Sequence, residues 1–348
     1  MHKDGSGDHV SRVLISGASG QDGFYLTDVC VREGDQVWAI LHGQSSPRHD
    51  LFRETFPMCT TLNGDVTDYG FMAYALGESK PDHVFNLAGI SFVPYSWHNP
   101  WLTSNVNGVA VAGILHSIDT QQKLQDRQIR LFQASTSEML GGTDGLVSDE
   151  SSRLHPRSPY AAAKALAHYS VSAYREGRGL HASCGIMFNH ESPLRGVEFV
   201  TRKIISFAVS RRLTGTGALK IGNVSASRDW GFAGDYVKSM RAILAQNEPG
   251  DYVLATQESH TVEELLELVF TSLQLGNWYD YTIQSSDLFR PGEVQWLCGS
   301  AEKARNILGW APELSFHDLV DLMIRSEYDW QKGGCQGIPN MWPSRTKN

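Results

Sequence analysis

The chain has 348 residues, of which 41% are hydrophobic, and its 38 Asp plus Glu against 30 Lys plus Arg give a formal net charge of −8. Nucleic-acid-binding proteins usually carry a basic surface, and a membrane helix needs about 18 consecutive apolar residues, so this sequence fits neither class. Five scattered cysteines without a CxxC pair argue against a disulfide framework or zinc site, and the N-terminus has no secretion signal. We expect a cytoplasmic protein with no metal, nucleic-acid or membrane partner.

Short β-branched apolar runs alternate with helix-length segments in the first half of the chain. Strands are expected at 12–16, 36–41, 60–63, 83–87, 129–134 and 182–188, and helices at 24–33, 68–78, 101–123 and 159–178. This alternation predicts an α/β fold with a Rossmann-type, doubly wound parallel sheet. Such sheets bind their ligands beyond the carboxyl ends of the strands.

The alternation breaks after residue 189. Helices are expected at 200–213, 235–246, 261–273 and 300–308, and short strands at 218–221 and 252–255. We predict a dinucleotide-binding domain of residues 11–190 plus about 232–257, and a smaller C-terminal substrate-binding lobe of 191–231 and 258–332. Residues 1–10 and 333–348 are predicted to be flexible termini.

A glycine-rich turn follows the first expected strand. Gly17 and Gly20 begin a GxxGxxG spacing that ends at Gly23 and opens a helix. Glycines at this spacing let a pyrophosphate approach the backbone and the N–H groups of the helix, although an ordinary strand–helix turn can carry the same spacing. Asp65, after the third strand, could accept a hydrogen bond from an adenine amino group or could cap a helix.

Tyr160 and Lys164 lie four residues apart, and therefore on one face of a helix that Ser158 can cap. The phenol has an ordinary pKa of about 10. A nearby ammonium group and a nicotinamide cation would lower that pKa and make Tyr160 a base near neutral pH. Thr136 and Glu138 follow the preceding strand, where they could hold a substrate oxygen and move a proton, or could form a surface turn.

Together these residues resemble the extended short-chain dehydrogenase/reductase family, and within it the GDP-mannose 4,6-dehydratases. The resemblance covers roughly residues 12–322. The most specific segments are Asn-His-Glu-Ser-Pro at 189–193 and Phe-Val-Thr-Arg-Lys-Ile at 199–204. Segments 133–138, 157–164, 228–231 and 290–294 also match, whereas the glycine spacing and YxxxK mark only the superfamily.

The resemblance implies a nucleotide-sugar dehydratase. Tyr160 removes the proton of the sugar 4-hydroxyl while a hydride passes from C4 to the cofactor, and Thr136 holds the oxygen. Glu138 then removes the C5 proton as water leaves C6, and the hydride returns to C6. The alternatives are a dehydratase acting on another NDP-sugar or an NDP-heptose, an NDP-sugar 4-epimerase or 4-reductase, and a catalytically silent homologue.

The resemblance also assigns residues by position. The catalytic positions are Thr136, Ser137, Glu138, Tyr160 and Lys164. The cofactor positions are Gly17, Ala18, Ser19, Gly20, Gln21, Asp22, Gly23, Asp65, Val66, Leu87, Ala88, Gly89, Ser91, Lys164, His190 and Arg195. The substrate positions are Ser91, Asn189, Arg202, Lys203, Arg228, Arg290 and Glu293. Arg suits diphosphate binding because its planar fork matches phosphate oxygens, but each of these cations could instead be a surface or interdomain charge.

The chain departs from the family after the second strand. His42 and Gly43 replace consecutive arginines at the 2′-phosphate site, where Arg48 or Arg53 could compensate. We expect NADP as the cofactor, with NAD as the alternative. The segment 91–95 replaces a more polar loop beside the sugar. The resemblance further implies a homodimer or homotetramer in which helices 101–123 and 159–178 pair across a twofold axis.

Overall fold

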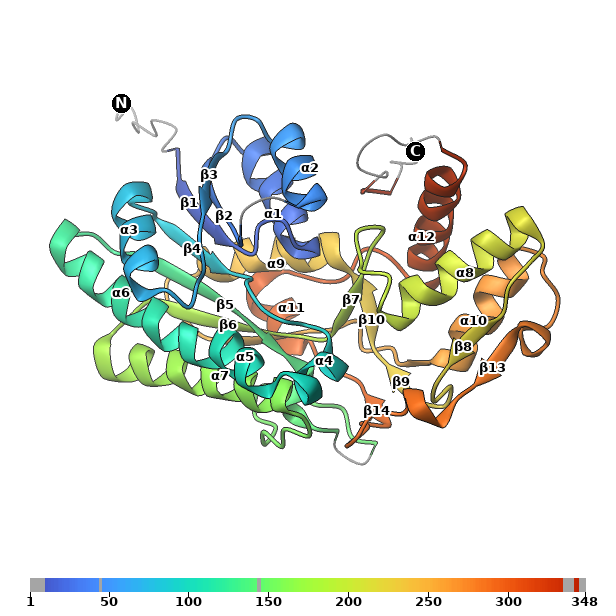
Figure 1. Cartoon of the computed structure of the whole chain (residues 1–348). Helices are drawn as coiled ribbons and strands as arrows, with labels where there is room; N and C mark the ends of the chain where they lie inside the picture. The colour runs from blue at the N-terminus through green and yellow to red at the C-terminus, as the bar shows by residue number, and fades with distance from the viewer. Residues whose placement is uncertain (1–9, 44–45, 143–144, 334–340, 344–348) are drawn as a thin grey trace, which may run out of the picture.

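A seven-stranded parallel sheet forms the centre of the first lobe of the molecule (Figure 1). The computed structural model describes residues 10–43, 46–142, 145–333 and 341–343. The strand order is β3-β2-β1-β4-β5-β6-β11, with β1 (Arg12–Ser16), β2 (Gln36–Leu41), β3 (Thr60–Asn63), β4 (His83–Asn86), β5 (Arg130–Thr136), β6 (Ala182–Met187) and β11 (Asp251–Leu254). The predicted Rossmann-type sheet is confirmed, and its order reverses between β1 and β4, which is where such folds bind dinucleotides.

Helices cover both faces of this sheet. One layer consists of α3 (Tyr69–Ser79), α6 (Ala110–Gln125) and α7 (Pro159–Arg178), and the other of α1 (Gln21–Arg32), α2 (Pro47–Thr55), α9 (Ala233–Leu244) and α11 (Glu302–Leu308). The bounds of α7 are those that the sequence predicts, since Ser158 accepts a hydrogen bond from the Ala161 N–H, Pro159 occupies the first turn, and Gly179 ends the helix at φ 68°.

The long helix expected at 101–123 is instead three consecutive pieces. These are α5 (Pro100–Ser104), a π-helical turn η1 (Asn105–Val109) and α6, and they follow the short helix α4 (Val93–His98). Asn107 lies in the π turn, where its side-chain amide accepts from the N–H of Ile90 (2.8 Å) and donates to the Ile90 carbonyl (2.9 Å). The irregular turn thereby fixes the loop after β4, a tertiary contact that helical periodicity cannot reveal.

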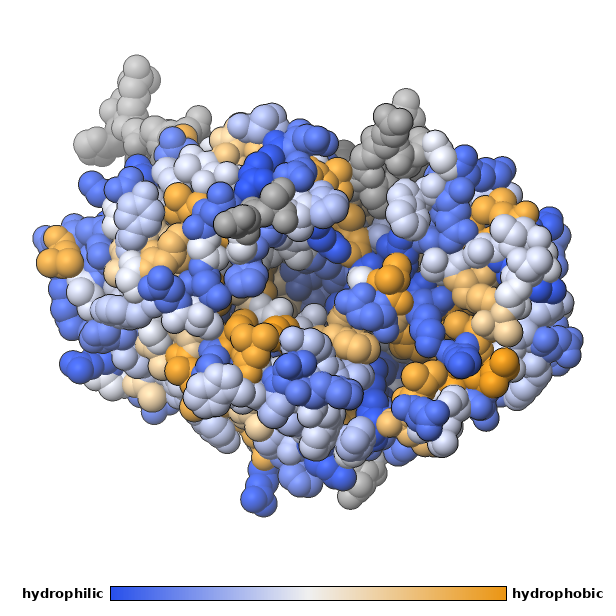
Figure 2. Space-filling model, in the orientation of Figure 1, coloured by the Kyte–Doolittle hydropathy of each residue, from blue (hydrophilic) through white to orange (hydrophobic). Residues whose placement is uncertain are grey.

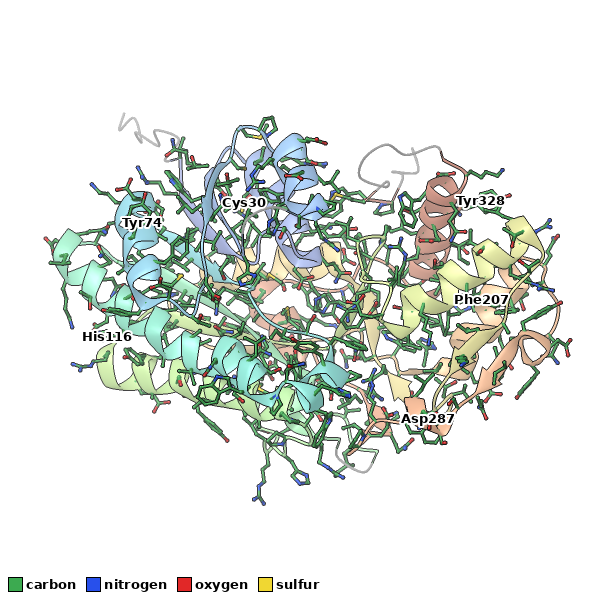
Figure 3. The ribbon with its side chains drawn as sticks, in the orientation of Figure 1. Cys30, Tyr74, His116, Phe207, Asp287 and Tyr328 are labelled. Atoms are coloured by element: carbon green, nitrogen blue, oxygen red, sulfur yellow. The ribbon has the colours of Figure 1, made fainter. Side chains whose placement is uncertain are left out.

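The second lobe is smaller and irregular. Its helices are α8 (Val200–Thr214), α10 (Val262–Ser272) and α12 (Phe316–Gln331), which pack on one another. Its strands are β7 (Asn189–Glu191), β8 (Leu219–Ile221), β9 (Ser227–Arg228), β10 (Trp230–Phe232), β12 (His260–Thr261), β13 (Thr282–Gln284) and β14 (Trp296–Leu297), and its 3-10 turns are η3 (Trp278–Tyr281) and η4 (Ser286–Leu288), with η2 (Ser137–Leu140) in the first lobe. Figure 3 marks Phe207 on α8 and Tyr328 on α12. The sequence did not predict α2 or α12.

The end of the chain returns to the first lobe. Trp342 donates a hydrogen bond to Asp28 Oδ2 (2.8 Å), and its ring packs edge-on against Tyr25, with 5.1 Å between the ring centroids. The Tyr25 hydroxyl donates to the Met341 carbonyl (2.6 Å). Within the segment 333–348, predicted to be flexible, residues 341–343 therefore pack against the first lobe, because α1 offers them both an apolar face and a carboxylate. Residues 1–9, 334–340 and 344–348 lie outside the described part of the chain.

Within the residues that the structure describes, none of the helices combines the length and apolar character needed to cross a bilayer.

We expect Trp342→Ala to lower the free energy of unfolding by about 1–3 kcal/mol, because it removes this ring packing and the bond to Asp28. The measurement is urea unfolding followed by circular dichroism. Leu124→Ala is the control, since Leu124 is 74% exposed and its loss should change the stability by less than about 0.5 kcal/mol. Equal stability of wild type and Trp342→Ala would mean that the terminal segment contributes nothing.

Candidate active site

Two adjoining cavities lie between the lobes, where Figure 2 shows the surface hollowed and hydrophobic side chains at the rim. The inner cavity lies at the carboxyl ends of the central strands. Most of the predicted site residues meet there: Gly17, Gly20, Gln21, Asp22, Gly23, Leu87, Gly89, Ser91, Thr136, Ser137, Glu138, Tyr160, Lys164, Asn189, His190, Arg195 and Arg290. The outer cavity, of about 660 Å³, lies against the second lobe.

The glycine-rich turn leaves no room for side chains. Gly17 has φ +70°, and a Cβ there would stand 2.8 Å from the Ala88 nitrogen; a Cβ on Gly23 would stand 2.4 Å from the Ala18 carbonyl oxygen. The N-cap residue of α1 is Gly20, so no side chain at this position binds the first N–H groups of the helix. The first N–H groups of α1 are therefore available beside the inner cavity, and the residues present fit the pyrophosphate of a nicotinamide dinucleotide.

Tyr160 and Lys164 enter the inner cavity from α7. The Lys164 ammonium donates to the Ala134 carbonyl at the end of β5 (3.0 Å). Burial raises the pKa of Tyr160 to about 12, although the Thr136 hydroxyl opposes this shift, and burial lowers the pKa of Lys164 to about 8. The protein's own groups thus raise the phenol pKa, so the lowering predicted from the sequence depends on the positive charge of a nicotinamide ring.

Thr136, Ser137 and Glu138 line the inner cavity together with Tyr160 and Lys164. Thr136 is the last residue of β5, and its hydroxyl accepts a hydrogen bond from the Glu138 N–H (3.3 Å) at the start of η2. Thr136 and Ser137 are buried, whereas Glu138 is half-buried. A hydroxyl, a carboxylate and a phenol therefore line one cavity, which is the set that acid–base chemistry on a hydroxylated substrate needs.

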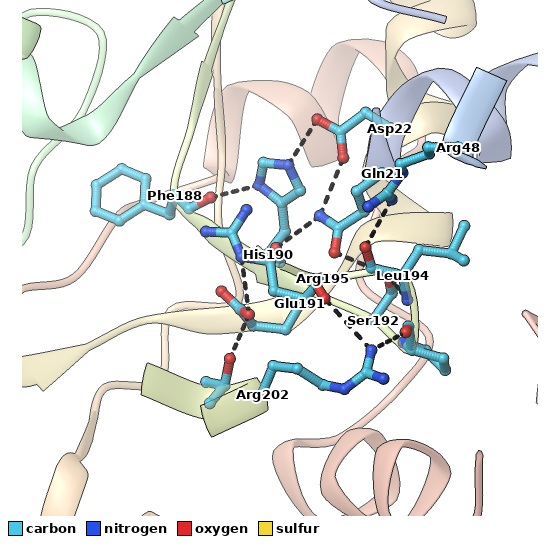
Figure 4. A network of polar contacts seen from close by, with 12 residues as sticks. Gln21, Asp22, Arg48, Phe188, His190, Glu191, Ser192, Leu194, Arg195 and Arg202 are labelled. Carbon is cyan, nitrogen blue, oxygen red and sulfur yellow. Dashed lines mark hydrogen bonds and ion pairs between the residues drawn. The ribbon is translucent and has the colours of Figure 1, made fainter. Parts of the chain in front are cut away.

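A polar network ties the glycine-rich turn to residues 188–195 (Figure 4). His190 Nε2 lies 2.9 Å from Asp22 Oδ2, and Nδ1 lies 2.8 Å from the Phe188 carbonyl. Gln21 donates to the His190 carbonyl (3.0 Å) and accepts from the Ser192 hydroxyl (2.8 Å). Burial disfavours both charges, but the attraction between them outweighs it, so the pKa of His190 is raised and that of Asp22 is lowered. His190 is thus a structural ion-pair partner that also lines the inner cavity.

Arg48 adds a second tie to the same turn. Its Nε donates to the Ser19 carbonyl (2.7 Å) and its Nη2 donates to the Leu194 carbonyl (2.8 Å). Arg53 instead donates to the Asn63 side chain (2.9 Å) and pairs with Asp50. The two arginines that the sequence offered as cofactor ligands therefore both have intramolecular partners.

The outer cavity gathers charged residues of the second lobe. Arg228 and Glu293 lie in its wall and pair with each other, with 3.2 Å between Nη2 and Oε1, and burial lowers the pKa of Arg228. Lys203 donates to the Lys220 carbonyl (2.7 Å) and also lines the cavity. The Asn189 side-chain oxygen is buried without a hydrogen-bond partner among the described residues, and Asn189 lines both cavities.

Arg202 does not lie in either cavity. It forms an ion pair with Glu327 of α12 (2.5 Å) and donates to the Pro193 carbonyl, and both charged side chains are buried. The structure therefore does not place Arg202 among the cavity residues, and its role in substrate binding stays a prediction. The cause is a carboxylate on a helix that the sequence did not predict.

Other predicted cofactor positions lie beside the inner cavity without lining it. Ala18 and Val66 are buried in the core. Ser19 lies within the glycine-rich turn, where its carbonyl accepts from Arg48, and the backbone of Ala88 packs beside Gly17. Asp65 instead lines a separate surface pocket with His42, whose Nε2 lies 3.3 Å from Asp65 Oδ2. The Thr67 N–H and hydroxyl both donate to Asp65 Oδ1. These bonds hold the pKa of Asp65 below its usual value, although partial burial of the carboxylate opposes the shift.

Several residues of the site were not among the predicted site residues, although segment 91–95 was expected beside the sugar. Phe92 and Phe199 line both cavities, Val93 lines the inner one, and Asn107 fixes the loop that carries them. Phe92 and Phe199 each stand directly before a helix. No spacing in the sequence marks them, because an aromatic residue before a helix is also a common packing position.

A family model described as GDP-mannose 4,6 dehydratase matches residues 14–323. The chain is 40% identical over 328 residues to GDP-mannose 4,6 dehydratase 1 of Arabidopsis thaliana, covering 92% of this chain and 90% of that protein. It is 37% identical to the GDP-mannose 4,6-dehydratase of Sinorhizobium fredii, covering 93% and 98%. The structure of the dTDP-glucose 4,6-dehydratase DesIV from Streptomyces venezuelae, determined with NAD bound, superposes with a TM-score of 0.81 at 23% identity, covering 93% and 99%.

We expect His190→Gln to lower the melting temperature more at pH 6 than at pH 9. Because the pKa of His190 is raised in the folded protein, its stabilisation is complete below the ordinary histidine pKa of about 6.5 and is lost as pH rises through the folded value. Differential scanning fluorimetry across this range measures the trend. His168→Gln is the matched control: burial lowers the pKa of His168, so its contribution grows with pH instead. A pH-independent effect of His190→Gln would contradict the ion pair.

Proposed function

Because this chain belongs to the GDP-mannose 4,6-dehydratase family, we propose that it converts GDP-mannose to GDP-4-keto-6-deoxymannose and acts as a hydro-lyase. The observation that carries this proposal is Glu138 in one cavity with Thr136 and Tyr160. A carboxylate beside the tyrosine supplies the second base that an elimination needs and that a simple alcohol oxidation does not.

The proposed roles follow from the positions of these groups. When bound, a nicotinamide cofactor would supply the redox chemistry, as the acceptor of a hydride from C4 of the sugar and the donor of that hydride to C6. Tyr160 accepts the 4-hydroxyl proton, and Thr136 donates a hydrogen bond to the same oxygen. Glu138 removes the C5 proton, which the C4 ketone has made acidic, and that proton leaves with the C6 hydroxyl as water. Lys164 adds positive charge beside the phenolate, and Ser137 supports the turn that holds Glu138.

The charged outer cavity suits the nucleoside diphosphate. We assign Asn189, Lys203, Arg228, Arg290 and Glu293 to this part of the substrate, and Ser91 to the junction with the cofactor. Its volume of about 660 Å³ lies within the range of small-molecule sites. In this division, residues 11–190 with about 232–257 bind the cofactor, and 191–231 with 258–332 bind the nucleotide sugar.

We propose NADP as the cofactor. At the end of β2, where an acidic side chain would bind the ribose hydroxyls of NAD, the chain has Leu41 and His42. Arg48 lies beside the turn through its bond to Ser19, and its positive charge favours a 2′-phosphate. The mass of the nucleotide released from the denatured protein distinguishes NADP from NAD. A mass that corresponds to NAD would overturn this assignment.

Incubation with GDP-mannose should yield a sugar nucleotide lighter by the mass of one water, detected by mass spectrometry. Glu138→Gln should lower the rate by at least about 100-fold, because the amide cannot take the C5 proton. Glu302→Gln, an exposed substitution on α11, is the control and should leave the rate unchanged.

Three results would contradict the proposal. Turnover without loss of water, unaffected by Glu138→Gln, would indicate a 4-epimerase or 4-reductase. Loss of water only from another nucleotide sugar would keep the reaction and change the substrate, with an NDP-heptose among the sugars to test. A tightly bound nucleotide with no turnover of any sugar would indicate a silent homologue.

We also propose a homodimer, with a tetramer of two such dimers as the alternative. Exposed apolar side chains gather on α5, η1 and α7, with Trp101 79% and Tyr169 60% exposed beside Leu102, Val109 and Leu166. Apolar surface of this kind is typical of a protein interface. Pairing α5, α6 and α7 with the same helices of a second copy would cover it around a twofold axis.

Leu166→Glu should therefore convert the protein to a monomer, because it places a charge in the centre of the proposed interface. Light scattering after size exclusion should give at least twice 38.6 kDa for the wild type and 38.6 kDa for the variant. Ile307→Glu on α11, where Ile307 is 50% exposed, is the control and should leave the mass unchanged. A wild-type mass of 38.6 kDa would refute the dimer.

The cysteines fit a reducing compartment. Cys30, Cys59, Cys184 and Cys298 are free thiols, and Cys335 lies outside the described residues. We propose a cytoplasmic location on this basis.

A further inference from the structure

Five residues line both cavities and so form the junction between them: Phe92, Asn189, Arg195, Phe199 and Arg290. The amide and the two guanidinium groups can bind phosphate oxygens. The two phenyl rings cannot, because they offer only apolar faces and weakly positive edges. The junction therefore has a polar part suited to a diphosphate and an aromatic part suited to something else.

The two rings meet across the gap between the lobes. Phe92 precedes α4 in the first lobe, and Phe199 precedes α8 in the second. Their ring centroids are 5.6 Å apart, with an interplanar angle of 75°. This edge-to-face contact joins segments of the two lobes directly at the opening between the inner and outer cavities.

Both rings are held in place by neighbouring groups of the protein. The Arg195 guanidinium carbon lies 3.5 Å from the centre of the Phe199 ring, and Arg195 Nε lies 3.1 Å from Glu191 Oε2. The Thr201 hydroxyl donates to the same carboxylate oxygen (2.5 Å). On the other side, Asn107 binds both backbone groups of Ile90, two residues before Phe92. The orientation of the pair is therefore fixed before a ligand arrives, which favours selective binding.

We propose that the Phe92–Phe199 pair contacts the sugar ring of the substrate and determines which sugars reach the acid–base residues. This inference rests on the proposed function: with the diphosphate in the outer cavity and the reacting carbons beside Tyr160 and Glu138, the sugar must cross the junction. A pyranose presents C–H groups on its faces, and these suit aromatic rings.

The test compares GDP with GDP-mannose, which differ only by the sugar. Isothermal titration calorimetry on the purified protein with its bound cofactor measures both dissociation constants. Phe92→Ala and Phe199→Ala should weaken GDP-mannose binding by about 10-fold or more and change GDP binding by less than about 2-fold. Phe199→Tyr keeps the ring and should restore wild-type GDP-mannose binding.

Trp97→Ala is the matched control, because Trp97 lines only the outer cavity. It should change the dissociation constants of GDP and GDP-mannose by the same factor. If the alanine variants fail to fold, as judged by circular dichroism, Phe92→Leu removes the ring at nearly constant volume and should also weaken GDP-mannose selectively.

Equal weakening of GDP and GDP-mannose by the Phe92 and Phe199 variants would overturn the proposal, since the pair would then contact the nucleotide or only support the fold. Unchanged binding of both ligands would overturn it as well. Failure of the proposed function itself can be distinguished from failure of this inference. In that case the wild-type protein binds GDP-mannose no more tightly than GDP and releases no water from it. In that event, the same binding test uses the nucleotide sugar that does lose water in place of GDP-mannose, and the matching nucleoside diphosphate in place of GDP.

Discussion

The buried pairing of Asp22 with His190 is the interaction on which the geometry of the site most depends. Asp22 lies in the first turn of α1, directly after the glycine-rich turn, and His190 lies in β7, where the chain leaves the sheet for the second lobe. Gln21 and Arg48 bind the same stretch of backbone, so three side chains fix one lobe against the other. A ligand that spans both cavities therefore meets walls whose separation is already set, and little ordering remains to oppose binding.

Local chemistry made much of the fold predictable. Ser158, Pro159 and Gly179 delimit α7. Each of them does so through its own backbone conformation or a hydrogen bond within one helical turn. The π turn was not predictable, because it is stabilised by Asn107 reaching Ile90 seventeen residues away in sequence. The same holds for the C-terminal segment: the polar residues around Trp342 suggest a loose end, and only the face of α1 makes burial favourable.

The residues of the candidate site show the same difference between local interactions, which the sequence reveals, and contacts distant in sequence, which it does not. Tyr160 and Lys164 were predictable, since a spacing of four places both side chains on one helix face. Arg202 and Arg228 look alike in sequence, and each pairs with a carboxylate in the structure. Glu327 holds Arg202 in the interior of the second lobe, whereas Glu293 lies in the wall of the outer cavity and leaves Arg228 there. Only tertiary structure separates an arginine held in the interior from one that lines a cavity.

The contact between Trp342 and Asp28 also constrains how the protein matures on the ribosome. The two residues are 314 positions apart. At a synthesis rate of about 5–20 residues per second, roughly 15–60 s pass between their appearances. Throughout that interval α1 lacks its final covering, and until residues 251–254 emerge the sheet also lacks its last strand, β11. The nascent first lobe therefore exposes apolar surface until late in synthesis, and exposed apolar surface of this kind is what makes incomplete chains prone to aggregation.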